Sequence, residues 1–339
     1  MDRWLKLGGA AFCGSILFLA NPRALWAEFQ VNSFTTSVQK SPAISHDSAG
    51  GFVVVWESRP QDGFIYGVFG KRFDNSGNTV GGEFQVNSFT AGVERYPAIS
   101  HDSAGGFVVV WHGNSQDGSS YGVLGKRFDS SGSTVGAEFQ VNSFTPSNQR
   151  SPALSHDSAG DFVVVWESYA QDGPVYGVFG KRFDSSGSTV GAEFQVNSFT
   201  ISVQKNSAIS HDSAGGFVVV WESYAQDGSN YGVFGKRFDS SGIAVGGEFQ
   251  VNSFTTSVQK NPAISHDSAG GFVVVWDSAQ DGSGFGVFGQ RFDSGGMVLG
   301  GEFQINSFTT SNQRSPAISH DSAGGFVVVW HSYAQDGFY

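Results

Sequence analysis

The sequence predicts an all-β fold, a β-propeller of about six four-stranded antiparallel blades with the last blade incomplete. Three observations predict it. A unit of about 55 residues recurs six times in tandem, each unit holds four short extended segments, and Asp/Gly turns join these segments in pairs. Self-similarity at such a period is typical of repeat folds, in which every unit packs only against its neighbours.

The repeats cover residues 28–339, which we expect to form a single repeat domain. The phrase HDSAGGFVVVW at residues 46–56 recurs unchanged in five of the six copies, and the third copy differs only at Asp161. The copies begin at Glu28, Glu83, Glu138, Glu193, Glu248 and Glu302, so four spacings are 55 residues and one is 54.

Each unit is predicted to contain four strands, which in the first copy cover residues 42–46 (A), 51–57 (B), 66–73 (C) and 83–87 (D). B is an unbroken apolar run, which is typical of a strand covered on both faces, whereas C and D alternate apolar and polar residues. The turns between A and B and between C and D place Asp first and Gly fourth, the preference of a type I turn. Four antiparallel strands favour a propeller blade over a β-helix, whose coils are shorter.

The sixth unit lacks a C strand. The sequence contains six A, six B and six D segments but only five C segments. The first D segment, residues 28–33, could close the ring beside the last A and B strands and leave a thin sixth blade. Otherwise an unpaired edge next to residues 327–330 would favour self-association with another chain, or the sequence would be part of a longer array.

Residues 1–27 are typical of a signal peptide. Arg3 and Lys6 precede an apolar run at residues 7–20 that is too short to span a bilayer. We therefore expect a mature chain that starts at Glu28, is secreted or held at the cell surface, and has no membrane span. An uncleaved anchor is the alternative.

Composition narrows the class of partner. Cys13, the only cysteine, lies in the apolar run, so the mature chain has no disulfide. Removal of residues 1–27 shifts the formal charge from −11 to −13. An acidic surface repels phosphate backbones, and nucleic acid is therefore not an expected partner.

Several motifs resemble the repeats of large secreted bacterial surface proteins, which often accompany calcium-binding RTX-type segments. These motifs are GFVVVW at residues 51–56, QDG at 61–63, YGVFGKRFD at 66–74 and EFQVN at 83–87. The resemblance implies a propeller-like extracellular module and brings no established chemistry. The glycine-rich RTX nonapeptide is absent from this sequence.

A weaker resemblance is to sialidase-type propellers. Asp74, Gly77 and Thr79 are similar to the Asp-box of those blades, but their spacing is one residue longer and Val80 stands where an aromatic residue is usual. The likeness is one of blade and not of activity.

Enzymatic activity is not expected from the sequence, and no catalytic residue is predicted. A glycosidase needs an acid with a raised pKa and a separate nucleophile or base. Carboxylates such as Glu57 and Asp74 have counterparts in most other units. A single asymmetric site would have to come from the few variable positions.

Metal ligands are not predicted either, and no cofactor is expected. A histidine ends every A segment, and the six histidines could form a ring of metal ligands. No Cys or second His follows at metal-ligand spacing, so a hydrogen bond from the histidine to the hairpin backbone is the favoured role. The acidic turns offer too few oxygens for a dedicated calcium site, so turn formation is favoured over calcium binding. The six histidines are His46, His101, His156, His211, His266 and His320.

Differences between copies gather on one face of the predicted propeller. The loops after B and D share that face, and after B the chain reads ESRP at residues 57–60, HGNS at 112–115 and ESYA at 167–170. After D, residues 36–41 become a different stretch at 91–96. Two explanations fit this variation. One is relaxed selection on exposed loops, and the other is a multivalent binding face.

If that face binds a glycan, we expect contacts from the recurring Gln-Asp pairs and nearby tyrosines, because such groups hydrogen-bond to sugars and stack on them. The same Gln-Asp-Gly phrase is also typical of a turn whose Asp caps the backbone. The candidate ligand-binding residues are Gln61, Asp62, Tyr66, Gln116, Asp117, Tyr121, Tyr169, Gln171, Asp172, Tyr224, Gln226, Asp227, Gln280 and Asp281.

The sequence thus predicts a non-enzymatic extracellular binding or adhesion module, glycan-binding through a multivalent loop face. Its expected partner is an extracellular glycan or a surface protein. The first alternative is a structural or assembly unit of the cell surface that self-associates through the incomplete last blade. A sialidase-like glycosidase is the remaining alternative.

Overall fold

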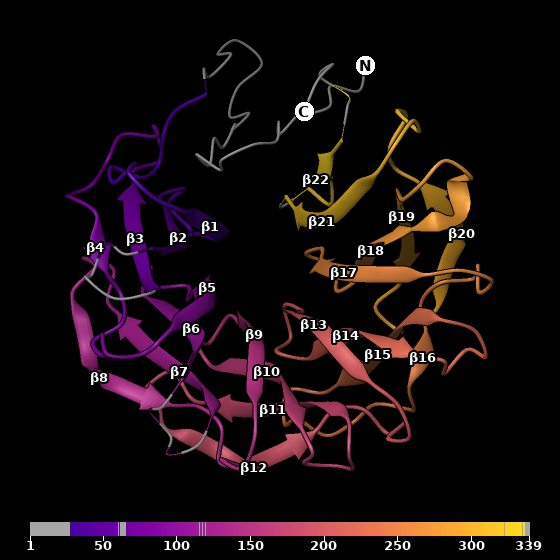
Figure 1. Ribbon diagram of the computed structural model, residues 1–339, viewed down its shortest axis with the longest axis horizontal. Helices are drawn as coiled ribbons and strands as arrows, with labels where there is room; N and C mark the ends of the chain where they lie inside the picture. The colour runs from indigo at the N-terminus through magenta and orange to yellow at the C-terminus, as the bar shows by residue number, and fades with distance from the viewer. Residues whose placement is uncertain are drawn as a thin grey trace.

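The computed structural model describes residues 28–59, 61, 66–114, 116, 118, 120–321, 323–333 and 335. The predicted signal peptide, residues 1–27, lies outside them, as do Asp62 and Asp117. Within the described chain, five four-stranded antiparallel sheets and one two-stranded sheet surround a common centre (Figure 1). The predicted all-β propeller is confirmed.

The first three blades occupy the indigo-to-magenta part of Figure 1. Their strands are β1 (Gln39–His46), β2 (Phe52–Ser58), β3 (Gly67–Phe73) and β4 (Phe84–Gln85); β5 (Glu94–His101), β6 (Phe107–Asn114), β7 (Tyr121–Phe128) and β8 (Thr134–Gln140); β9 (Gln149–His156), β10 (Phe162–Tyr169), β11 (Tyr176–Phe183) and β12 (Thr189–Gln195).

The other three blades complete the arc from orange to yellow. Their elements are β13 (Gln204–His211), β14 (Phe217–Tyr224), β15 (Tyr231–Phe238) and β16 (Phe249–Gln250); β17 (Gln259–His266), β18 (Phe272–Ser278), the short 3₁₀ turn η1 (Ala279–Asp281), β19 (Gly286–Phe292) and β20 (Val298–Gln304); and, in the sixth blade, β21 (Gln313–His320) and β22 (Phe326–Ser332).

The predicted A, B, C and D segments are these strands in order. The A strand begins three residues earlier than expected, at Gln39, because a register shift between Lys40 and Ala43 interrupts its pairing with β2 and lets the strand continue. In every blade the A strand is innermost, and the A strands of successive blades contact each other around the centre (Figure 1).

The core lies between blades and not within them. The B strand β2 is buried along its whole length, as its unbroken apolar run predicts. Val53 and Val55 on one of its faces pack against Phe107 and Trp111 of the second blade. The same sandwich recurs at the next three boundaries, and each buried side chain of this size contributes about 1.5–3 kcal/mol.

Polar links also join successive blades. At the His46 end of the inner strands, the backbone N–H of His101 donates to Ser45 Oγ at 3.1 Å, and that of His156 donates to Ser100 Oγ at 3.2 Å. Near the rim, the Arg72 guanidinium donates to the carbonyl oxygen of Ser130 in the next blade at 2.6 Å. Such links are repeated with each unit.

The N-terminal segment packs on the first blade in the way that β4 packs on the second blade. Phe29 packs on Phe73 at 5.5 Å between ring centroids and 53° between ring planes, and Phe84 packs on the next blade's Phe128 at 5.6 Å and 58°. Val327 of β22 is 67% exposed, whereas its counterpart Val53 is 3% exposed. Whether another copy of the chain covers Val327 stays a prediction.

Candidate functional site

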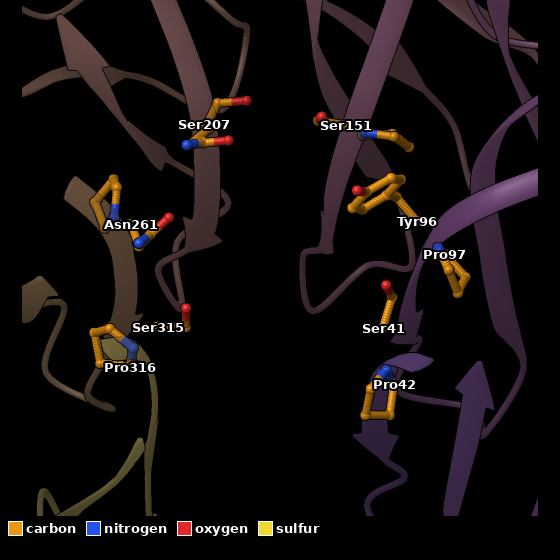
Figure 2. Close-up of a pocket in the computed structure, with 12 residues that line it drawn as sticks. Ser41, Pro42, Tyr96, Pro97, Ser151, Ser207, Asn261, Ser315 and Pro316 are labelled. Atoms are coloured by element: carbon orange, nitrogen blue, oxygen red, sulfur yellow. The ribbon is translucent and has the colours of Figure 1, made fainter. Parts of the chain in front are cut away.

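A cavity of about 350 Å³ lies on the axis, lined by inner strands from all six blades (Figure 2). It opens at the end where the inner strands begin, which is the face of the variable loops. Its wall consists of Ser41, Pro42, Tyr96, Pro97, Ser151, Pro152, Asn206, Ser207, Asn261, Pro262, Ser315 and Pro316.

One residue of each inner strand adopts a left-handed backbone conformation at this wall. The φ angle is +51° at Ser41, Tyr96, Ser151, Asn206, Asn261 and Ser315. This conformation costs about 1–3 kcal/mol for a residue other than glycine and persists only where its surroundings enforce it. The register shift that lengthens the A strand occurs at these residues.

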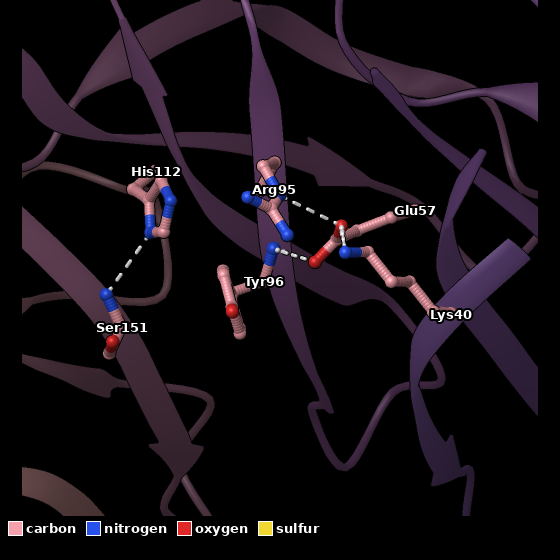
Figure 3. A network of polar contacts seen from close by, with 6 residues as sticks. All are labelled: Lys40, Glu57, Arg95, Tyr96, His112 and Ser151. Carbon is pink, nitrogen blue, oxygen red and sulfur yellow. Dashed lines mark hydrogen bonds and ion pairs between the residues drawn. The ribbon is translucent and has the colours of Figure 1, made fainter. Parts of the chain in front are cut away.

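Several of these residues donate a backbone hydrogen bond to the preceding blade. The backbone N–H groups of Tyr96, Asn206 and Asn261 donate to Glu57, Glu167 and Glu222 at 2.9, 2.9 and 2.7 Å. The N–H of Ser151 donates to His112 Nδ1 at 3.2 Å (Figure 3). All four acceptors occupy the same position of their B strands.

We call this position the collar. It pairs with the cationic residue that precedes each left-handed residue, as in Lys40 with Glu57 and Arg95 with His112. The six collar residues are Glu57, His112, Glu167, Glu222, Asp277 and His331. Unlike most of the repeat, the collar varies in charge from blade to blade.

Glu57 is the collar carboxylate with the closest cation. Its Oε2 lies 3.1 Å from Arg95 Nε and 3.9 Å from Lys40 Nζ, and the side chain is fully buried (Figure 3). The next collar residue, His112, is buried between Arg95 and Arg150, and this burial lowers its pKa to about 3. His112 is therefore neutral at physiological pH, and its Nδ1 accepts a hydrogen bond.

The third, fourth and fifth blades form an acidic arc of Glu167, Glu222 and Asp277. Burial raises the pKa of all three carboxyls, and for Asp277 burial and the nearby Glu222 raise it to about 6. Glu222 accepts hydrogen bonds of 2.7 Å from both the Asn261 N–H and the Asn206 side chain, and Lys205 lies 3.8 Å away. Burial therefore disfavours the ionised form of both carboxyls, while the hydrogen bonds and Lys205 partly offset this effect at Glu222.

The glutamines of the predicted sites are engaged within their own blades. Gln116, Gln171, Gln226 and Gln280 donate to the outer-strand glutamates Glu138, Glu193, Glu248 and Glu302 at 2.6, 2.5, 2.8 and 2.6 Å. Gln61 donates in the same way to Glu83. These contacts tie the loop after B to the outer strand of the same blade.

The described aspartates of the Gln-Asp-Gly phrase accept local hydrogen bonds. Asp227 and Asp281 accept from backbone N–H groups two residues later, each at 3.1 Å. Asp172 accepts from Gln195 at 2.6 Å and Asn197 at 3.2 Å. A role of these residues in ligand binding stays a prediction.

The predicted tyrosines form aromatic and cationic stacks on the same face. Tyr66 lies between Lys40 and Arg95, at 5.0 and 4.8 Å from its ring centroid, and Tyr121 packs edge-on against His112 at 5.1 Å. Tyr169 and Tyr224 are 38% and 43% exposed and pack on Tyr176 and Tyr231. The structure therefore groups them around the collar and not around the glutamines.

The sequence pattern did not single out the collar or the left-handed residues. The change from Glu57 to His112 was visible as variation after the B strand, and the change from Ser41 to Tyr96 as variation after D. Only the antiparallel register and the ring bring the two positions together at the axis.

No group of three or more His, Cys, Asp or Glu side chains that could hold a metal ion occurs among the described residues. The backbone N–H groups of inner-strand histidines such as His101 and His156 donate the hydrogen bonds that link neighbouring blades. Calcium dependence stays a prediction. In the described part of the chain, no helix has the length and apolar character needed to cross a membrane.

Comparison with known proteins places this geometry among propellers. No family model matches the chain, and no curated protein matches its sequence. Its fold is similar to the GH93 α-L-arabinofuranosidase of Fusarium graminearum (11% identity, TM-score 0.59, covering 86% of this chain and 87% of that one). Similar too are the α-L-arabinanase of Penicillium chrysogenum (14%, 0.57, 85% and 87%) and a PL25 ulvan lyase (10%, 0.54, 78% and 71%).

These matches correct two predictions and support part of a third. The non-enzymatic adhesion module and the exclusion of enzymatic activity are wrong, because the fold's solved neighbours named above are glycoside hydrolases and a polysaccharide lyase. The near-identity of the copies argued against a single asymmetric site, whereas the collar varies in charge from blade to blade. The resemblance to a propeller module is confirmed, but its assignment to RTX-associated surface proteins gains no support.

Proposed function

We propose that this protein is a glycan-processing enzyme, a glycoside hydrolase that admits its substrate to the axial cavity from the variable face. The observation that carries the proposal is the acidic arc beside that cavity, where Glu222 and Asp277 are buried in adjacent blades and burial raises the pKa of both carboxyls, that of Asp277 to about 6. Glycoside hydrolysis needs such a pair, an acid with a raised pKa and an ionised partner.

In this proposal Asp277 donates its proton to the glycosidic oxygen of the leaving group. Glu222, whose ionised form is favoured by two hydrogen bonds and Lys205 against the effect of burial, serves as the base or nucleophile on the sugar. Both carboxyls are buried behind the cavity wall, where the Asn206 side chain bonds Glu222 and the Asn261 side chain bonds Asp277. The two amides turn toward sugar hydroxyls as the substrate enters.

The test is hydrolysis by the purified full chain, with arabinan, galactan, polygalacturonate and ulvan as substrates and new reducing ends as the readout. Glu222→Gln and Asp277→Asn should each lower kcat about 100-fold or more. The matched control is Asp293→Asn, an exposed turn carboxylate at the opposite end of the fifth blade, which should leave kcat unchanged.

Two results contradict the proposal: no cleavage of any of these glycans by folded protein, or products that carry a new carbon–carbon double bond, which would indicate a lyase. The pH profile adds a check. Because Asp277 must be protonated and burial raises its pKa to about 6, the rate should decline as pH rises above about 6.

Export and self-association also remain proposals. Secretion guided by residues 1–27 would place the enzyme beside extracellular polysaccharides, and the exposed Val327 on β22 is where a second copy would attach. The loop residues Gln171, Asp172 and Tyr169, with their counterparts, would then contact the glycan outside the cavity.

A further inference from the structure

Tyr96 differs from its five equivalents. The left-handed positions of the other blades carry serine or asparagine, which tolerate a positive φ, and their side chains are small. A bulky aromatic residue at φ +51° is a true outlier. Strained residues of this kind cluster at ligand sites, so the outlier itself calls for a functional explanation.

The surroundings of Tyr96 hold its ring out in the cavity. The side chain is 46% exposed, although it lines the axial wall between Ser41 and Ser151 (Figure 2). His112 supports the ring at 5.1 Å between centroids with 32° between planes, and the Arg95 guanidinium lies 5.0 Å from the ring centroid. Arg95 is in turn held by Glu57 at 3.1 Å, so the support is itself fixed (Figure 3).

We propose that Tyr96 is the stacking platform that binds one sugar ring of the substrate and sets its position in the axial cavity. An aromatic face that is exposed and held in place stacks on the C–H face of a pyranose or furanose ring at little cost in side-chain entropy. The serines and asparagines around it supply hydroxyl and amide groups for the sugar hydroxyls. This inference rests on the proposed glycan substrate and adds the residue that positions it.

The test exploits the repeat itself. Tyr96→Asn installs the residue that Asn206 and Asn261 provide at the same position, so the variant should fold and its melting temperature should rise as the strain is relieved. Tyr96→Phe keeps the ring. The control is Ile201→Thr, an 83% exposed apolar residue on the same face but outside the cavity, where three other repeats carry threonine.

Calorimetric titration with arabinotetraose, cellotetraose and trigalacturonate measures binding directly. For the sugar that binds the native chain, Tyr96→Asn should weaken affinity about tenfold, while Tyr96→Phe and Ile201→Thr should stay within about threefold. In saturation-transfer NMR, the contact to the sugar C–H protons should be lost with Tyr96→Asn alone.

Unchanged affinity of Tyr96→Asn, or no binding of any of the three sugars by the native chain, would overturn the platform. Because the titration measures binding alone, it decides this inference even if no glycan is hydrolysed. Conversely, hydrolysis with an unchanged KM in Tyr96→Asn would leave the proposed hydrolase standing and remove the platform.

Discussion

At the scale of single residues, the collar shows how one position acquires different charge states in similar blades. Glu57 and Glu222 occupy the same B-strand position, yet Glu57 lies 3.1 Å from the guanidinium of Arg95, whereas Glu222 has a lysine at 3.8 Å and two asparagine donors. The same residue type at the same position therefore meets different cations and hydrogen-bond donors in different blades.

The buried pair of Glu57 and Arg95 gives a prediction at this scale. Glu57→Ala should destabilise the fold by about 3–5 kcal/mol, because it leaves Arg95 without its carboxylate and the Tyr96 N–H without its acceptor. Urea unfolding measures the change. Lys40→Ala is the control, since its ammonium is partly exposed and 3.9 Å away, and should cost less than about 1 kcal/mol. Equal losses of unfolding free energy in the two variants would show that the Glu57–Arg95 pair contributes no more to stability than the Lys40 contact.

At the scale of elements, the outer strand is held by one contact repeated around the ring. Phe84 of β4 lies opposite Gly70 of β3 in the antiparallel register, and its ring covers the glycine. A Cβ added at Gly70 would lie 2.7 Å from Phe84 Cζ. The glycine in the GKRF phrase therefore has a packing role: it lets an aromatic ring of the outer strand reach the core between blades.

Gly70→Ala should destabilise the protein by about 1–3 kcal/mol, because the Phe84 ring would have to move away from the next blade. Thermal unfolding followed by circular dichroism measures the loss. Gly82→Ala in the same blade is the matched control, since a Cβ there meets nothing within 4 Å and two other repeats carry alanine at this position. A loss no larger than that of Gly82→Ala would mean that the ring does not press on the strand.

At the scale of the whole molecule, the ring concentrates partly buried histidines at the end opposite the collar. Burial lowers the pKa of His101, His156 and His266 to about 4 and that of His211 to about 3. The inner strands of the second to fifth blades each contribute one such histidine, and neighbouring ones disfavour each other's charge. The packing of neighbouring blades therefore favours the neutral form of these histidines.

Because the folded pKa of these histidines lies below the unfolded value of about 6.5, the unfolded chain binds more protons below pH 6.5. Their contribution is complete above pH 6.5 and is lost as pH falls toward about 4. Between pH 6.5 and pH 5 the loss should be about 2 kcal/mol for each well-buried histidine, measured as the free energy of unfolding in urea.

His156→Gln should flatten this pH dependence, whereas His46→Gln, an exposed histidine at the same position of the first blade, should not. A pH profile identical to that of the native chain in His156→Gln would contradict the assignment. Asp277 acts in the opposite sense, since its raised pKa of about 6 destabilises the fold as pH rises through that value.

Much of the fold could be predicted from the sequence alone, because the period, the apolar B strands and the Asp/Gly turns are local and recur in each copy. Residues 28–33 repeat the outer-strand segment of later copies, and Phe29 packs on the first blade as Phe84 packs on the second. The collar was not readable as a site, because Glu57 and Tyr96 lie 39 residues apart and on different blades.

The sequence by itself determined the blade, the number of repeats and the face on which the copies differ, since these follow from residues close together in the chain. Only the tertiary structure decided that Tyr96 lines the axial cavity and that Glu222 and Asp277 are buried behind its wall. This arrangement depends on the curvature of the ring. It also depends on hydrogen bonds between blades at residues with a left-handed backbone conformation. Burial then raises the pKa of both carboxyls, and the proposed chemistry uses the raised pKa of Asp277.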